Sequence, residues 1–246
     1  MSHALAEIPY EVSDRIESIV TEDDEPVDNF FSAKQQTLLK RALYASWTPQ
    51  PSEDQPEQRR KFLADANVGI FFALYEQPLV PDFFLSLDVE PHQNWYDKEH
   101  RSYFVWEFGK VPEIALEIVS NRKGGELASK FKAYARMGVS YYVVYDPLKR
   151  LSEDVLCVYE LGFGKRYRPR KDHRMPELGL SLTLWQGVFE GKENTWVRWC
   201  DTDNQLIPTG EERAVTAEHR AAEAEAELAK LRAELLRQNS KSKRNK

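Results

Sequence analysis

Two acidic residues in the middle of the chain stand in apolar surroundings where a carboxylate needs a partner. Glu117 lies within "IALEIVS", residues 114–120. By the two-residue period of a strand, three aliphatic residues share one face: Ile114, Leu116 and Ile118. Glu117 then points to the other face with Ala115 and Val119. Because charged carboxylates are rarely tolerated there unpaired, Glu117 needs solvent, a lysine on a packed helix, or a cation.

Asp82 supplies a second carboxylate at the start of an earlier strand, in "VPDFF". Two carboxylates can share one divalent cation, and hard cations such as Mg²⁺ take oxygen ligands without any His or Cys. We therefore predict that Asp82 and Glu117 lie on adjacent strands, about 4–6 Å apart, and bind Mg²⁺, with Mn²⁺ as an alternative.

A lysine on the following helix is the third candidate for the site. Lys130 shares a helix face with Glu126 and Tyr134 at spacings of four residues, so it could reach the end of the strand that carries Glu117. The alternative is that Lys130 forms an ordinary surface ion pair with Glu126. Lys123, in the loop between strand and helix, is a weaker candidate for the same role.

The elements that must position these residues read as a mixed α/β pattern. A helix is predicted over residues 29–47, with Asp28 as its N-cap. Strands follow in "NVGIFFALY", "VPDFFLSLD", "SYFVWEF" and "PEIALEIVS". A helix over 125–137, closed by Gly138, leads to further strands in "SYYVVYD", "VLCVYEL" and "KRYRPR". The strand after this helix should pair in parallel with one before it.

The C-terminal segment has the heptad pattern of a coiled coil. Its apolar positions recur at alternating spacings of three and four: Ala214, Ala217, Ala221, Ala224, Leu228, Leu231 and Leu235. We predict a helix over 210–238 that joins two copies of the chain through residues 214–238. A single solvated helix is the alternative, because alanines bury little area. The basic segment 239–246 is expected to be disordered.

Composition excludes several classes of protein. The chain has 246 residues, 41% hydrophobic, with a net charge of -6, which is enough for a folded core and does not suit a basic nucleic-acid coat. Cys157 and Cys200 stand far apart without a CxxC, which argues against a disulfide framework or zinc cluster. No apolar run could span a membrane, so we expect a soluble cytoplasmic protein.

Basic residues are available for a substrate, especially in "KRYRPRKDHR", residues 165–174. Arginines interleaved with a tyrosine suit contact with a nucleic-acid backbone. The alternative is an edge hairpin whose positive charges prevent pairing with another sheet.

The order of these motifs resembles the Uma2 restriction-endonuclease family, a branch of the PD-(D/E)xK nucleases. The resemblance rests on "VPD" at 80–82, "ALEIVS" at 115–120, Lys130 and Tyr134, and "GVSYYVVYDP" at 138–147. It implies a central mixed sheet flanked by helices, with Asp82 and Glu117 as Mg²⁺ ligands and Lys130 as the catalytic lysine. Val119 stands where the superfamily usually has that lysine, so the helix must supply it.

The resulting hypothesis is a Mg²⁺-dependent endonuclease acting on DNA, with RNA as the alternative substrate. The expected organisation is an acidic tail over 1–26, a nuclease-like domain over 27–190, a linker over 191–209, the coiled-coil helix and the basic tail. The alternative is a catalytically degenerate nuclease fold that binds nucleic acid or a protein through its C-terminal helix.

Overall fold

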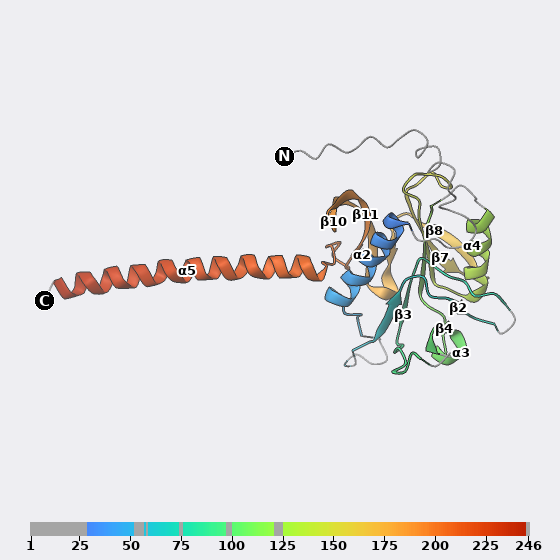
Figure 1. Ribbon diagram of the computed structural model, residues 1–246, viewed down its shortest axis with the longest axis horizontal. Helices are drawn as coiled ribbons and strands as arrows, with labels where there is room; N and C mark the ends of the chain where they lie inside the picture. Colours follow the sequence, from blue (N-terminus) through green and yellow to red (C-terminus); the bar gives the residue numbers. More distant parts are fainter. Residues whose placement is uncertain are drawn as a thin grey trace, which may run out of the picture.

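The structure is a computed structural model of the chain and describes residues 29–51, 57, 59–73, 76–96, 100–120 and 125–244. These residues form a body of sheets and helices, from which one long helix projects (Figure 1). The acidic tail expected over residues 1–26 lies outside the described residues.

A six-stranded mixed sheet forms the centre of the body. Only one pair of neighbours is parallel: β5 and β6, joined by α4 (Gly125–Met137). This crossover confirms the predicted parallel pairing. The other neighbours pair antiparallel. In spatial order the strands are β1 (Phe62–Asp65), β3 (Phe83–Leu87), β5 (Ile114–Ile118), β6 (Tyr141–Tyr145), β7 (Leu156–Gly162) and β8 (Arg166–Arg170).

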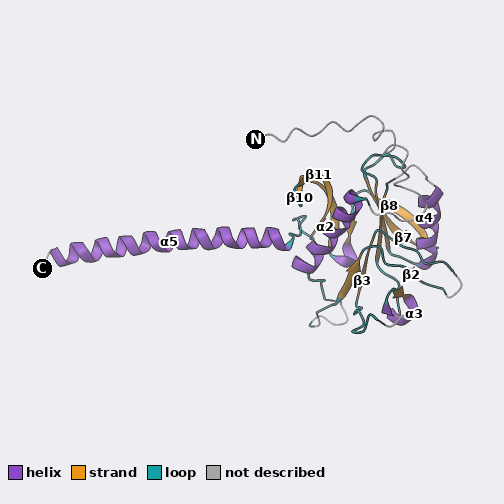
Figure 2. Cartoon of the chain, in the orientation of Figure 1, coloured by secondary structure: helices purple, strands orange, loops and turns teal. Residues whose placement is uncertain are grey.

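Different layers cover the two faces of this sheet (Figures 1 and 2). One face packs against α2 (Phe30–Ser46) and a second sheet, whose strands are β9 (Arg174–Met175), β10 (Leu180–Phe189) and β11 (Lys192–Cys200). The other face packs against α4. Strand β5 follows the predicted alternation: Ile114 and Leu116 lie in the first core, and Ala115 lies in the second.

Both helices that flank the sheet have identifiable ends. The N-cap of α2 is Asn29, not the predicted Asp28, and its side chain accepts a hydrogen bond of 2.9 Å from the Ser32 amide. At the end of α4, Gly138 takes the left-handed φ of 104° that the glycine closure predicts.

A small parallel sheet and a single helical turn lie on the α4 side of the body. β2 (Ile70–Phe71) pairs with β4 (Tyr103–Phe104). The predicted strand over "SYFVWEF" is therefore wrong after Phe104, because the chain continues as α3 (Val105–Phe108). β2 offers only two residues for pairing, and Gly109, at a left-handed φ of 71°, ends the helical turn.

The linker predicted over residues 191–209 is wrong for its first half, which forms the core strand β11. β11 pairs antiparallel with β10: at one end of the ladder Ser181 lies opposite Cys200, and at the other end Phe189 lies opposite Lys192. Glu190 and Gly191 both have positive φ, as a tight hairpin turn requires. The strand begins with exposed polar residues and becomes fully buried only from Trp196 onward, which is why its sequence resembles a loop.

The long helix α5 (Gly210–Arg244) is fastened to the body at its first turn. Thr209 and Glu212 form a capping box: the Thr209 amide donates to Glu212 over 2.8 Å, and the Glu212 amide donates to the Thr209 hydroxyl over 3.3 Å. Glu212 also accepts two hydrogen bonds of 2.7 Å from the buried Arg198. The helix continues beyond residue 238 to Arg244. The prediction that the chain is disordered from residue 239 is therefore wrong for residues 239–244.

Candidate active site

The two acids predicted to act together lie side by side on the same sheet face, Glu117 on β5 and Asp82 immediately before β3. The antiparallel register pairs Phe83 with Leu116 and Phe84 with Ala115, so it brings Asp82 opposite Glu117. Ala115 and Phe84 belong to the core beneath α4, and Glu117 and Asp82 follow at two-residue steps along their strands.

Asp82 is oriented by the backbone of the neighbouring strand and by helix α2. Its Oδ2 accepts a hydrogen bond of 2.6 Å from the amide of Ile118, and its Oδ1 accepts one of 3.2 Å from Gln36 Nε2. Gln36 is buried, and its amide group also exchanges hydrogen bonds with Asn67.

Gln36 is a further residue of this site and was not among the residues predicted from the sequence. It lies 46 positions before Asp82, and no local pattern joins the two. The available signal was a pair of amides, Gln35 and Gln36, within an otherwise amphipathic helix. Buried amides need partners. Gln35 Nε2 donates to the Val197 carbonyl, and the Val197 amide donates to Gln35 Oε1, each over 2.9 Å.

Helix α4 supplies a partner to each oxygen of Glu117. Lys130 Nζ lies 2.9 Å from Oε2, and the Tyr134 hydroxyl donates to Oε1 over 2.9 Å. Lys130 thus reaches the sheet from one turn before Tyr134. The alternative partner Glu126 and the weaker candidate Lys123 have side chains outside the described residues.

Burial makes Glu117 an unusually weak acid for a glutamate. Its side chain is almost fully enclosed, which raises its pKa to about 8, and the nearby negative charge of Asp82 acts in the same direction. The ammonium of Lys130 lowers the pKa but does not cancel the effect of burial. A cation bound beside Glu117 would favour its carboxylate form.

Another acid ends the adjacent strand but serves a different purpose. Asp146 follows β6 and is fully buried. Its carboxylate accepts hydrogen bonds of 2.8, 2.7 and 3.0 Å from the amides of Arg150, Leu151 and Ser152, and these bonds hold its pKa below the usual range. Asp146 thus anchors a loop.

The donor set of the candidate site suits a hard cation. Within the described parts of the chain, no three His, Cys, Asp or Glu side chains cluster as metal ligands. Two carboxylates, however, are what Mg²⁺ usually takes from a protein, the remaining positions being filled by water and substrate phosphate. The carboxyl groups of Asp82 and Glu117 fit that requirement.

Residues 166–170 of the basic segment at 165–174 form β8, the edge strand of the central sheet, and Arg174 begins β9 of the second sheet. Tyr167 is buried under α4, whereas Arg166 and Arg168 are exposed. Arg170 pairs with Glu160 and Asp172. The turn before β8 lies at the opposite end of the strands from Glu117, because Gly162 pairs with Arg166 and Glu160 with Tyr141. The exposed arginines at this end of the segment are accounted for by protection of the edge strand against pairing with another sheet.

The mixed sheet, the flanking helices and the facing carboxylates define a restriction-endonuclease-like α+β protein, as the sequence predicted. The chain belongs to the Uma2 family, whose description reads "Putative restriction endonuclease": residues 22–187, more than half of the chain, match it. No curated protein matches the chain. Among the described residues, no helix is both long and apolar enough to cross a membrane.

The raised pKa of Glu117 predicts a pH-dependent effect of Glu117→Gln on stability. A carboxyl group with a folded-state pKa of about 8 and an ordinary value of 4.5 binds more protons in the folded state between these values. In EDTA, the wild type should therefore lose stability as pH rises from 4.5 to 8, and Glu117→Gln should not.

Thermal unfolding at pH 5 and pH 8.5 measures this difference. The melting temperature of Glu117→Gln relative to wild type should increase by roughly 5 °C between the two pH values, corresponding to a few kcal/mol. Glu193→Gln, at an exposed position on β11, serves as the control and should follow the wild type. Parallel curves for wild type and Glu117→Gln would contradict the assignment of a buried, weakly acidic carboxyl group.

Proposed function

We propose that the protein is a metal-dependent endonuclease that hydrolyses phosphodiester bonds of DNA. Asp82 and Glu117 would hold Mg²⁺, or Mn²⁺, and Lys130 would act on the scissile phosphate or its attacking water. The observation that carries the proposal is the meeting of two facing carboxylates and one ammonium at the same end of the sheet.

The residues around the acids have separate tasks in this proposal. The Ile118 amide and Gln36 orient the Asp82 carboxylate. Tyr134 fixes one oxygen of Glu117, and Lys130 lies against the other. A bound cation would supply charge neutralisation at the phosphate and a more acidic water. Lys130 could then turn from Glu117 toward the phosphate oxygens, since its side chain is 21% exposed.

A catalytically degenerate fold that only binds nucleic acid or a protein is the second candidate. Val119 occupies the strand position where the superfamily usually carries its lysine. Lys130 argues against degeneracy, because its amine reaches Glu117 from the helix over 2.9 Å. The two candidates differ in whether any substrate is cut.

The direct test is incubation of the full chain with linear, circular and single-stranded DNA and with RNA, in Mg²⁺, Mn²⁺ or EDTA. Cleavage of DNA that requires Mg²⁺ or Mn²⁺ is expected. Cleavage that persists in EDTA would reject the metal-dependent mechanism. Binding without cleavage under every condition would favour the degenerate fold.

We also propose that the protein is a dimer joined through residues 214–238 of α5. The nuclease-like domain proposed over residues 27–190 then includes β11 as well, because Val197 and Trp199 of that strand lie in the same core. The described side chains of α5 from Ala214 to Leu235 are all exposed, including Leu228, Leu231 and Leu235 at 53%, 51% and 58%. The helix projects from the body (Figure 1). An exposed heptad seam can pair with the same helix of a second copy of the chain. A symmetric dimer would then hold two active sites, one for each strand of a DNA duplex.

Light scattering of the full chain tests the dimer. Replacing Leu228, Leu231 and Leu235 together by Glu should shift the mass from dimer to monomer at tens of micromolar, roughly the range of weak association. Ala226→Glu with Ala233→Glu, off the seam, is the matched control. Glu212 is left unchanged in all of these variants, because it pairs with the buried Arg198. A monomeric wild type would defeat the proposal.

A further inference from the structure

A pocket lined by aromatic side chains lies on the same sheet face as the candidate active site. Its volume is about 220 Å³, and it lies between the β1–β3 edge of the sheet and residues of the stretches 91–95 and 100–108. This volume is below the roughly 300–1,000 Å³ that is typical of sites for drug-sized molecules. The pocket therefore suits one small group.

The walls of this pocket form a continuous series of ring contacts. The rings of His92 and His100 stack at 3.8 Å, and His92 contacts Phe108 at 5.6 Å. Phe108 stacks on Tyr103 at 4.4 Å, and Tyr103 meets Phe84 edge-on at 5.4 Å. Such flat apolar walls favour a planar, aromatic occupant.

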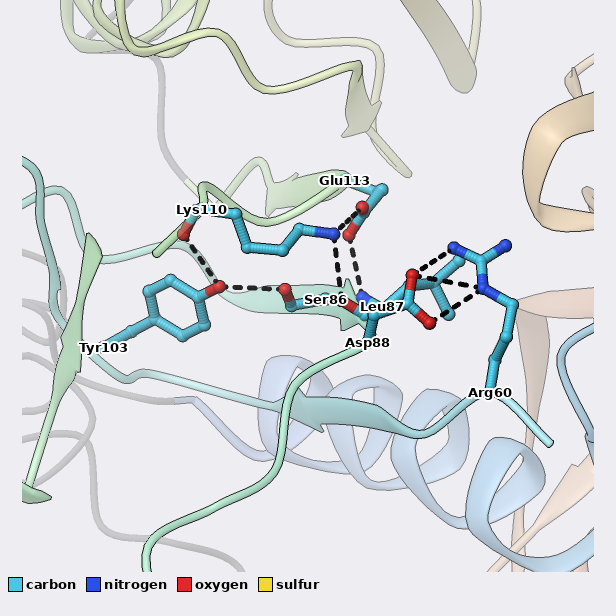
Figure 3. Close-up of polar contacts among 7 residues, drawn as sticks. All are labelled: Arg60, Ser86, Leu87, Asp88, Tyr103, Lys110 and Glu113. Atoms are coloured by element: carbon cyan, nitrogen blue, oxygen red, sulfur yellow. Dashed lines mark hydrogen bonds and ion pairs between the residues drawn. The ribbon is translucent and has the colours of Figure 1, made fainter. Parts of the chain in front are cut away.

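Tyr103, which lines the pocket, is held by hydrogen bonds of its hydroxyl group. The Tyr103 hydroxyl donates to the carbonyl of Lys110 over 3.0 Å and lies 2.9 Å from the Ser86 hydroxyl (Figure 3). Lys110 in turn donates to the Leu87 carbonyl over 2.9 Å and pairs with Glu113, whose carboxylate accepts from the Leu87 amide. These contacts hold the Tyr103 ring through its hydroxyl group.

The rim of the pocket adds an exposed aromatic ring and polar groups. Trp95 lines the pocket and is 61% exposed. Arg101 and Ser102 line it as well, and the guanidinium of Arg101 is held by the carbonyl of Tyr96. An exposed indole beside hydrogen-bonding groups matches the way proteins receive an unstacked base.

The pocket also lies close to the acids along one strand. Phe84 lines the pocket and lies on β3 two residues after Asp82, which directly precedes the strand, a step of about 7 Å. Asp65 lines the pocket as the cross-strand partner of Phe84, and Val68 lines it directly after Asn67, which bonds to Gln36. A nucleic acid with its phosphate at Asp82 would thus carry a base within reach of the pocket.

We propose that this pocket binds one unpaired nucleobase of the substrate, next to the scissile phosphate. The inference rests on the proposed nuclease function for its ligand, although binding can be measured without cleavage. The enzyme would then prefer single-stranded or locally unpaired DNA over a perfect duplex, because a paired base must first be unstacked.

The test measures binding of the full chain in EDTA to a fluorescent twelve-residue deoxythymidine oligonucleotide and to an abasic chain of equal length. Trp95→Ala should weaken binding of the first roughly tenfold, within the range for loss of one stacked base, and leave the second unchanged. Trp106→Ala, an exposed aromatic residue outside the pocket lining, is the control and should change neither.

Quenching of tryptophan fluorescence by thymidine monophosphate gives a second readout, with deoxyribose 5-phosphate as the blank. Quenching should occur in the wild type and be reduced in Trp95→Ala. Equal affinity of the wild type for both oligonucleotides, or no loss in Trp95→Ala, would overturn the proposal. If Asp82→Ala kept full cleavage, the nuclease site would be wrong instead, so the two failures are distinguishable.

Discussion

Asp82→Ala is expected to reduce Mg²⁺-dependent DNA cleavage by at least ~10³-fold, since a bound cation contributes several kcal/mol to charge stabilisation at the phosphate. The carboxylate of Asp82 is the one that both the Ile118 amide and Gln36 hold in place. Its removal should also abolish the increase in melting temperature that Mg²⁺ gives the wild type, because a ligand that binds the folded state stabilises it.

Two companion variants sharpen this expectation. Asp203→Ala removes an exposed acid outside the site and should retain wild-type cleavage. Gln36→Ala should leave both carboxylates in place but release Asp82 Oδ1, so we expect an intermediate loss, on the order of 10–100-fold, as for other groups that orient metal ligands. Full activity of Asp82→Ala would refute the assignment of the metal site.

Lys130→Ala is expected to reduce the rate of cleavage ~10²–10³-fold with little change in affinity for the oligonucleotide, a range seen when one charge-stabilising group is removed. The reason is position: Lys130 Nζ lies 2.9 Å from Glu117. Its loss also removes the main influence that lowers the Glu117 pKa, so the rise of activity with pH should move to higher pH.

The matched control is Lys132→Ala, an exposed lysine two residues further along α4, which should behave as the wild type. Lys130→Arg keeps the charge but changes its shape, so partial recovery is expected. If Lys130→Ala cleaved DNA at the full rate, Lys130 would be an ion-pair partner of Glu117 and nothing more. Comparison of single-turnover rates at several pH values separates these outcomes.

The sequence by itself determined the parts of this protein that depend on local periodicity. Alternation in "IALEI" predicted which residues of β5 face each core, and it singled out Glu117 as an acid on an apolar face. Spacing along α4 predicted that Lys130 and Tyr134 share a side of the helix, and Gly138 marked the end of that helix. These features need only the geometry of one element.

Other features were decided only by the tertiary structure, because their partners are distant in sequence. Gln36 meets Asp82 across 46 positions. The first residues of β11 are polar and resemble a linker, yet the strand pairs with β10 and buries Trp196 and Trp199 in the core. The aromatic pocket likewise gathers rings from β3, β4, α3 and the stretches 91–95 and 100–102. A polar residue or a short strand acquires its role from what packs against it, and that is set by long-range pairing.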